Sequence, residues 1–167
     1  SLQFLAGRAR QAEALYILGH LFETWIGDAD NDEPYHAEIV SALRAASDAG
    51  LKISVMHGNR DFLLGSGFTA ASGTLLLKDP YVLSTAEWQF VLSHGDALCL
   101  DDSAYMAFRA QVRSPEWQAT LLAKPLSERR AIAAHMREVS ESSQRGKDNP
   151  YTDLQAAATD DFLREHG

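Results

Sequence analysis

Short apolar runs that alternate with amphipathic stretches are the feature that most limits how the first half of this chain can fold. Ala14–Leu18 (ALYIL) is a short apolar run that ends at Gly19. Apolar residues between positions 36 and 49 recur at helical spacing, and Gly50 follows as a stop signal for a helix. A second apolar run, Lys52–His57 (KISVMH), comes next. This order predicts strand, helix and strand, which is typical of α/β proteins.

The rest of the chain is predicted to hold a few more short strands and then only helices. Strands are expected at 74–77, 81–84 and 88–93. Helices are expected at 103–113, 116–122, 127–143 and 152–166, separated by Pro115, Pro125 and Pro150. The polar stretch Ser142–Asn149 is the expected linker. We therefore expect a core over residues 1–100, a helical insertion that caps it over 101–148, and a helix that returns to the core over 149–167.

Composition excludes several classes of protein. The 167 residues carry 15 basic and 23 acidic side chains, a formal net charge of −8, so binding to nucleic acid through a general positive field is not expected. The single cysteine, Cys99, permits neither an internal disulfide nor a multi-cysteine zinc site, which suits a reducing cytosol. No apolar run approaches the roughly 20 residues that span a bilayer. We expect a protein that is soluble or at most bound to a membrane surface.

Three polar clusters follow predicted strands, and each is flanked by glycine. They start at Gly19-His20, Gly58-Asn59 and His94-Gly95. Asparagine, histidine and carboxylate side chains suit divalent cations such as Mn²⁺, and ligand sites of open α/β sheets lie at the carboxyl ends of the strands. Any one cluster by itself is more often an ordinary capped turn between a strand and a helix. The three in series predict a metal-centred active site.

The strings around these clusters resemble a known family. Read as GHLFETWIGD, HGNRDFLLG and SHGDALCLDDSAYMAFR, they resemble the calcineurin-like metallophosphoesterases and, within them, the UDP-2,3-diacylglucosamine hydrolases of lipid A synthesis. The resemblance runs from Phe4 to Leu163. It implies an α/β fold in which a two-sheet sandwich is flanked by helices and a helical insertion caps a lipid-binding cleft. It also implies an enzyme with two Mn²⁺ that hydrolyses the pyrophosphate of UDP-2,3-diacylglucosamine to UMP and 2,3-diacylglucosamine 1-phosphate.

The resemblance also implies roles for individual residues. It implies catalytic roles for Asn59, Arg60 and His94, with Asn59 and His94 as metal ligands. The residues implied to contact substrate are Asn59, Arg60, Asp102, Tyr105, Arg137, Ser140, Gln144 and Lys147. A guanidinium suits phosphate because its fork pairs two phosphate oxygens. The last four residues are spaced to share one helical face, if the helix extends that far.

Simpler interpretations of the same residues stay open. Arg60 can instead be a solvated charge in a turn or a structural partner of Asp61. The helical residues can form an ordinary solvated face. Apolar residues of the insertion, such as Trp117 and Leu121, can line an acyl-chain cleft or simply pack their helices together.

The sequence departs from the family pattern at three places. His20 stands where the family has the aspartate that bridges both metals. An imidazole can bind one metal, but it has a single neutral lone pair and cannot bridge two. The opening Asp-x-His and closing Gly-His-x-His motifs of the family are not in the sequence, so we expect a fold that is incomplete at both ends. We therefore expect this polypeptide to be inactive or poorly active.

Three functions remain open on the sequence. The first is hydrolysis of UDP-2,3-diacylglucosamine, the second is non-catalytic binding of a phosphorylated headgroup by a homologue that has lost its metals, and the third is a metallophosphoesterase with another substrate. The resemblance implies a cytoplasmic protein held peripherally on the inner face of the bacterial inner membrane. Arg129, Arg130 and Arg137 are candidates for contact with anionic lipids.

Overall fold

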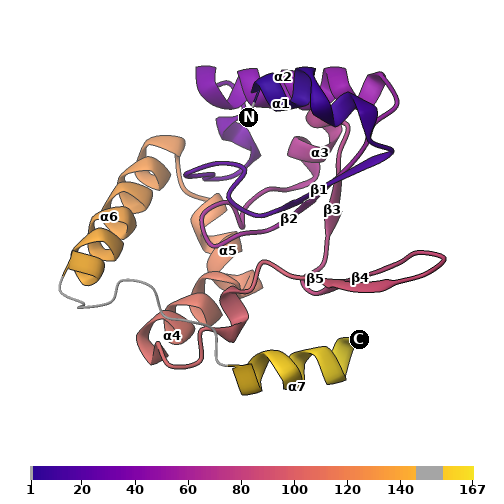
Figure 1. Ribbon diagram of the computed structural model, residues 1–167. Helices are drawn as coiled ribbons and strands as arrows, with labels where there is room; N and C mark the ends of the chain where they lie inside the picture. Colours follow the sequence, from indigo (N-terminus) through magenta and orange to yellow (C-terminus); the bar gives the residue numbers. More distant parts are fainter. Residues whose placement is uncertain (1, 146–155) are drawn as a thin grey trace. The chain divides into compact units, whose positions relative to one another are not determined.

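The computed structural model describes residues 2–145 and 156–167, and its architecture is α/β (Figure 1). The first half holds α1 (Leu2–Ala6), the 3₁₀ helix η1 (Arg8–Gln11), β1 (Ala14–Leu18), η2 (Asp28–Asp30), α2 (Pro34–Asp48), β2 (Lys52–Met56), α3 (Ser66–Ser72), β3 (Leu75–Leu77), β4 (Tyr81–Ser84) and β5 (Gln89–Leu92). The second half holds η3 (Asp96–Leu98), α4 (Ser103–Val112), α5 (Pro115–Leu122), α6 (Leu126–Arg145) and α7 (Ala156–His166). The predicted α/β class is confirmed.

The chain divides into two compact units. The first unit comprises residues 1–81 and 92–94, and the second comprises residues 82–91 and 95–167. The first therefore contains the parallel strands, and the second contains the helices from α4 onward.

The first unit is built on a three-stranded parallel sheet in the order β1-β2-β3. β1 pairs with β2 from Ala14 opposite Lys52 to Leu18 opposite Met56, and β2 pairs with β3 from Ser54 opposite Leu75. Parallel strands need a crossover connection, which α2 supplies between β1 and β2. Because these strands run in the same direction, the loops that follow β1 and β2 emerge at the same edge of the sheet.

Helix α2 packs on this sheet through one apolar face. Ile39, Leu43 and Ala46 are buried, at spacings of four and three residues. The helix begins after Glu33, whose carboxylate accepts a hydrogen bond from the backbone N–H of His36 at 2.9 Å. Figure 1 shows α1 and α2 side by side along the same side of the sheet. Burial of this face holds the β1 and β2 strands, and therefore the loops that follow them, in place.

One expectation about local structure is corrected, and one helix was not expected. The stretch Ser142–Asn149 was expected to be a linker, but α6 extends through residues 142–145. Gln144 and Arg145 are good helix formers, and extending an existing helix costs far less than nucleating a new one. Residues 146–149 lie outside the described part of the chain. The small-residue segment before Gly73 forms α3, which the apolar pattern did not predict.

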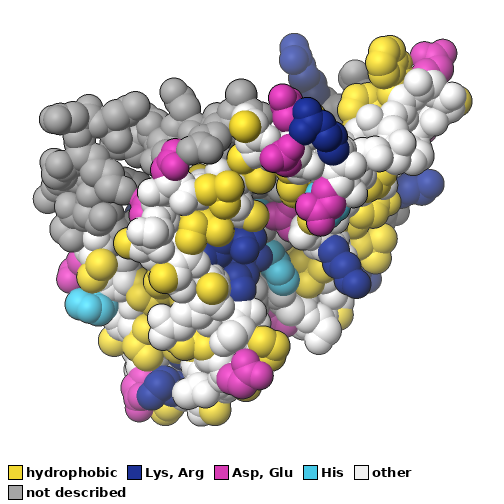
Figure 2. Space-filling view, turned by 90° about the horizontal axis from the view of Figure 1, so that it is seen from below, with side chains coloured by type: hydrophobic (Ala, Val, Ile, Leu, Met, Phe, Trp, Pro, Cys, Tyr) yellow, Lys and Arg dark blue, Asp and Glu magenta, His cyan; other side chains and the backbone are white. Residues whose placement is uncertain are grey.

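The surface gives no sign of a membrane-spanning element. Across residues 2–145 and 156–167, every helix is too short or too polar to cross a bilayer. On the face drawn in Figure 2, acidic and basic side chains are interspersed with apolar ones, and no single sign of charge covers it.

Candidate metal and phosphate site

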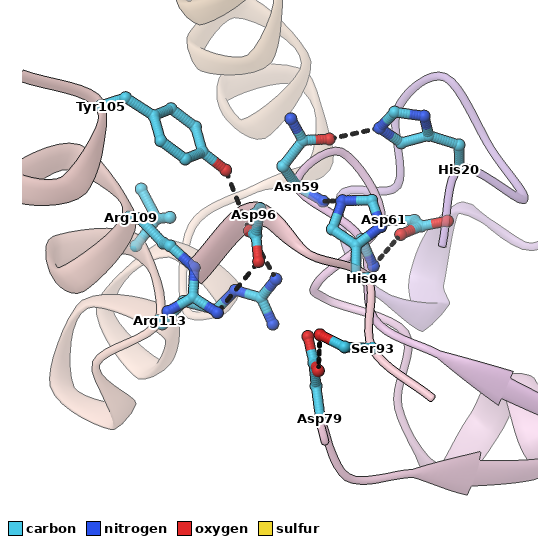
Figure 3. Close-up of polar contacts among 12 residues, drawn as sticks. His20, Asn59, Asp61, Asp79, Ser93, His94, Asp96, Tyr105, Arg109 and Arg113 are labelled. Atoms are coloured by element: carbon cyan, nitrogen blue, oxygen red, sulfur yellow. Dashed lines mark hydrogen bonds and ion pairs between the residues drawn. The ribbon is translucent and has the colours of Figure 1, made fainter. Parts of the chain in front are cut away.

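The three residues that were proposed as metal ligands lie close together: His20 follows β1, Asn59 follows β2 and His94 follows β5 (Figure 3). His20 Nε2 lies 2.5 Å from Asn59 Oδ1. The backbone N–H of Asn59 donates to His94 Nε2 at 3.3 Å, and the rings of His20 and His94 lie 5.0 Å apart, edge to face. Residues 39 and 35 positions apart in sequence thus meet at one edge of the sheet.

Two glycines make this meeting sterically possible. A Cβ atom on Gly19 would lie 2.5 Å from His94 Nδ1 and 2.8 Å from the Cα of Gly58. A Cβ atom on Gly58 would lie 2.8 Å from the backbone nitrogen of His20. Real Cβ atoms do not approach other atoms so closely, so only glycine fits at either position.

His94 is held in a defined orientation. Its Nδ1 lies 2.8 Å from the carbonyl oxygen of Leu18, the last residue of β1. A carbonyl only accepts, so Nδ1 carries the hydrogen and the lone pair of the neutral ring is on Nε2. A backbone carbonyl that fixes one ring nitrogen while the other is presented to a cation is the usual arrangement of metal-binding histidines.

His20 has an unusual backbone for a side chain of its size. Its φ is +52°, and it is the one non-glycine residue with positive φ among those described. Asparagine, aspartate and histidine tolerate this left-handed region better than other residues. The loop geometry therefore accepts aspartate at this position as well as histidine.

Arg60 forms an ion pair with Glu23, its Nη1 donating to Oε2 at 2.7 Å. One interpretation of the sequence made Asp61 a structural partner of Arg60. That interpretation is wrong, because the Asp61 carboxylate accepts hydrogen bonds from backbone N–H groups instead. The backbone N–H of Trp25 donates to the Arg60 carbonyl at 3.2 Å. Arg60 is thus tied to the loop after β1 through both its main chain and its side chain.

In the second unit, Asp102 and Tyr105 make structural contacts. The carboxylate of Asp102 caps α4, accepting from the backbone N–H of Tyr105 at 3.0 Å. The hydroxyl of Tyr105 donates to Asp96 Oδ2 at 2.9 Å. Their contact with substrate stays a prediction.

Asp96 lies at the centre of a charged cluster that the sequence reasoning did not predict (Figure 3). Arg109 Nη2 lies 3.0 Å from its Oδ1 and Arg113 Nη2 lies 3.3 Å from its Oδ2. Burial by itself raises the pKa of Asp96, but Arg109, the Tyr105 hydroxyl and Arg113 together outweigh it and lower the pKa. The sequence does contain a pattern that indicates part of this cluster, because Tyr105, Arg109 and Arg113 are spaced by four residues, which places them on one face of a helix.

The remaining residues that the resemblance implied for substrate contact lie on or beyond α6. Arg137 is an exposed residue of this helix, and the backbones of Ser140 and Gln144 belong to it. Lys147 and the side chains of Ser140 and Gln144 lie outside the described residues. Arg129 is corrected as a candidate for lipid contact, because its side chain is buried and its Nε donates to the Lys124 carbonyl at 3.0 Å.

The donors at the edge of the sheet fit one divalent cation better than two. Asn59 Oδ1, His94 Nε2 and His20 offer neutral oxygen and nitrogen donors of the kind that Mn²⁺ accepts. In the part of the chain that is described, no three His, Cys, Asp or Glu side chains are grouped to hold a metal. Two carboxylates of the same loops are engaged, Asp61 by backbone N–H groups and Glu23 by Arg60. The described residues therefore do not fit a carboxylate-bridged pair of cations.

Comparison with known proteins places this chain in a family. The chain is 48% identical over 167 residues to a UDP-2,3-diacylglucosamine hydrolase from Chromobacterium violaceum, matching 99% of this chain and 70% of that protein. Proteins of the same name from Klebsiella pneumoniae and Chromohalobacter salexigens are 46% and 43% identical, each over 99% of this chain and over 68% and 67% of their own length. The chain belongs to the UDP-2,3-diacylglucosamine hydrolase family. No protein-family model matches it.

Membership of the UDP-2,3-diacylglucosamine hydrolase family confirms the resemblance drawn from the three strings. Those strings contain the glycines, His20, Asn59 and His94 that the fold gathers at the edge of the sheet. The roles of the individual side chains stay predictions.

Proposed function

We propose that this chain takes part in hydrolysis of UDP-2,3-diacylglucosamine at its pyrophosphate, giving UMP and 2,3-diacylglucosamine 1-phosphate in lipid A biosynthesis. The observation that carries the proposal is the 43–48% identity, over 99% of the chain, to proteins named as hydrolases of this compound. The approach of His94, which follows β5, to Asn59, which follows the parallel strand β2, supports it, because ligands of open α/β sheets bind at the carboxyl ends of the strands.

In this proposal Arg60 binds the substrate phosphates. Its guanidinium carries a permanent charge and presents two parallel N–H groups, which match two phosphate oxygens. Asn59 and His94 hold a manganese ion, and His20 lies beside them. A divalent cation, when bound, polarises a phosphoryl oxygen and lowers the pKa of a coordinated water. The Leu18 carbonyl accepts from His94 Nδ1, which leaves the lone pair of His94 on Nε2, the atom that faces Asn59.

The other proposed contacts are those that the resemblance implies. Asp102, Tyr105, Arg137, Ser140, Gln144 and Lys147 are the proposed partners of the sugar and phosphates. The acyl chains of such a substrate reside in a bilayer, so we also propose peripheral attachment to the cytoplasmic face of the inner membrane. Arg130 and Arg137, which are exposed on α6, suit anionic headgroups.

The test is release of UMP from UDP-2,3-diacylglucosamine with and without Mn²⁺. We expect weak release by the protein as it is and at least a roughly tenfold increase in His20→Asp, because aspartate tolerates the same backbone and can bridge two cations. Arg60→Ala is the matched loss-of-function variant and should raise the KM. Equal activity of the protein and His20→Asp, both insensitive to chelator, would contradict a metal-bridging role for this position.

One observation favours a second function, which is binding of a phosphorylated headgroup without catalysis. His20 replaces the bridging carboxylate, and no described group of acidic or histidine side chains is arranged to hold a metal. In that case the protein binds UMP or the lipid with an affinity that chelator does not change. His20→Asp would then show no increase in Mn²⁺ binding or in UMP release, whereas Arg60→Ala would still have a lower affinity for UMP or the lipid.

A further inference from the structure

Asp61 is a buried charged residue that the proposed chemistry does not use. It follows Arg60 in the loop after β2, and its exposed fraction is 0%. A carboxylate removed from water is strongly destabilising unless hydrogen bonds replace its hydration. The hydrogen-bond donors to Asp61 therefore show which parts of the chain this carboxylate connects.

Both oxygens of Asp61 accept hydrogen bonds from backbone N–H groups, and these come from two different loops. Oδ1 accepts from Gly58 N at 2.7 Å, in the loop after β2. Oδ2 accepts from Leu21 N at 2.7 Å and from Phe22 N at 3.4 Å, in the loop after β1. Hydrogen bonds to an ionised acceptor are shorter and stronger than neutral ones. Asp61 is thus a cross-link between the ends of two neighbouring strands.

The cross-link lies next to both residues that approach each other at the candidate site. Leu21 immediately follows His20, and Gly58 immediately precedes Asn59. The two bonded N–H groups are therefore each one residue away from a side chain of the 2.5 Å His20–Asn59 contact. The loops are tightly packed at Gly58. A Cβ atom added there would lie 2.8 Å from His20 N and 2.9 Å from Asp61 Oδ1, so neither loop can shift without moving the other.

We propose that Asp61 is a positioning residue, which sets the separation of the loops after β1 and β2 and thereby the geometry of Asn59, His20 and His94 toward a divalent cation. The inference rests on the proposed function for the identity of the ligand. The arrangement of the loops themselves is independent of it.

The test is the variant Asp61→Asn, which keeps the size of the side chain. An amide has one accepting oxygen and one donating nitrogen, so it can serve one loop but opposes an N–H group of the other. We expect His94 of the metal-free variant to show altered imidazole ¹⁵N shifts, and the two-ring contact with His20 to weaken in nuclear Overhauser spectra. We expect Mn²⁺ affinity, measured by electron paramagnetic resonance, to fall about 10- to 100-fold, the usual size of an effect that acts through the ligands.

The control is Asp30→Asn. Asp30 is also a buried aspartate of the first unit, and its Oδ2 lies 3.4 Å from His36 Nδ1 rather than at the candidate site. We expect this variant to lose stability while leaving the His94 shifts and the Mn²⁺ affinity unchanged. Equal changes in both variants would overturn the positioning role, because a general loss of stability would then explain them.

If Asp61→Asn does not fold, amide hydrogen exchange of the unaltered protein tests the cross-link instead. The amides of Leu21 and Gly58 should exchange slowly, and rapid exchange of either would overturn the cross-link. If the unaltered protein binds no Mn²⁺ and releases no UMP, the proposed function fails. The metal-free His94 shifts and the amide exchange still decide the role of Asp61 in that case.

Discussion

Two buried aspartates, one in each unit, are stabilised by different kinds of hydrogen-bond partner. Asp61 follows the candidate ligand Asn59 by two residues, and Asp96 follows His94 by two. Asp61 is fully buried and is held by backbone N–H groups of two loops. Asp96 is 7% exposed and is held by side chains of α4 and of the residue that caps its C-terminus: Tyr105, Arg109 and Arg113. Main-chain partners fix loops to each other, and side-chain partners fix a helix to the loop that precedes it.

Because their partners differ, substitution of each aspartate is expected to have a different effect. Arg109 and Arg113, two of the partners of Asp96, carry charge, so removing the carboxylate takes away a charge partner that two largely buried guanidinium groups share. The partners of Asp61 are neutral backbone groups next to His20 and Asn59, so a change there is expected to move the candidate ligands. Stability is expected to depend more on Asp96, and metal affinity more on Asp61.

The largest expected effect is that of Asp96→Ala. Because Arg109 and Arg113 are each about four-fifths buried, loss of their shared carboxylate should lower the free energy of unfolding by about 3–5 kcal/mol. Urea denaturation followed by circular dichroism measures this. Asp48→Ala, which removes an exposed ion pair with Arg44 at 3.2 Å, is the control and should cost less than about 1 kcal/mol. Similar losses in the two variants would remove the distinction between the regions.

A smaller effect is expected at the junction that Asp61 cross-links, in Gly58→Ala. The new methyl group would lie 2.8 Å from His20 N, so one of the two loops has to move, at a cost of about 1–3 kcal/mol. Calorimetric unfolding and Mn²⁺ titration should both change. Gly50→Ala is the contrast, since Gly50 has a φ of +100° but no atom within 4 Å of its Cβ position. It should lose stability through backbone strain alone and retain its affinity for Mn²⁺.

The smallest expected effect is a pH dependence that comes from Asp96. Burial opposes its ionisation, but Arg109, Tyr105 and Arg113 prevail and its pKa is lowered from 3.8. Below that value the unfolded state binds a proton more readily than the folded state, so the stabilisation is fully present above pH 3.8 and is lost as pH falls through the lowered pKa. The stability difference between the protein and Asp96→Asn should therefore shrink in acid. A difference that grows as the pH falls would reverse the sign assigned here.

Much of the framework could be predicted from the sequence, because it depends on local periodicity. β1 and β4 have the predicted bounds, and β2 and α4 differ by a single residue at one end. The convergence of His20 and Asn59 was also predictable, since both follow parallel strands, which end at one edge of the sheet. His94 follows β5, which pairs with β4 in a second sheet, so this argument does not extend to it. Helix α3 was missed because Ser66–Ser72 is rich in small residues and has no apolar stripe.

The partners of the charged residues were not predictable in the same way. Asp61 was considered only as a partner of its neighbour Arg60, and the structure pairs Arg60 with Glu23 instead. The N–H groups of Leu21 and Gly58 leave no signature in a sequence, because every residue except proline has one. The Asp96 cluster was partly predictable from the spacing of Tyr105, Arg109 and Arg113, although nothing in that spacing identifies the acid that they share.

The sequence by itself determined the α/β class, the family and the residues that gather at the ends of the strands, because these depend on hydrophobic period, glycine position and identity of side chains. Only the tertiary structure decided which groups neutralise the two buried aspartates. That choice depends on which main-chain amides and side chains remain within about 3 Å of each carboxylate after packing. Such distances between residues far apart in the chain are set by the fold as a whole.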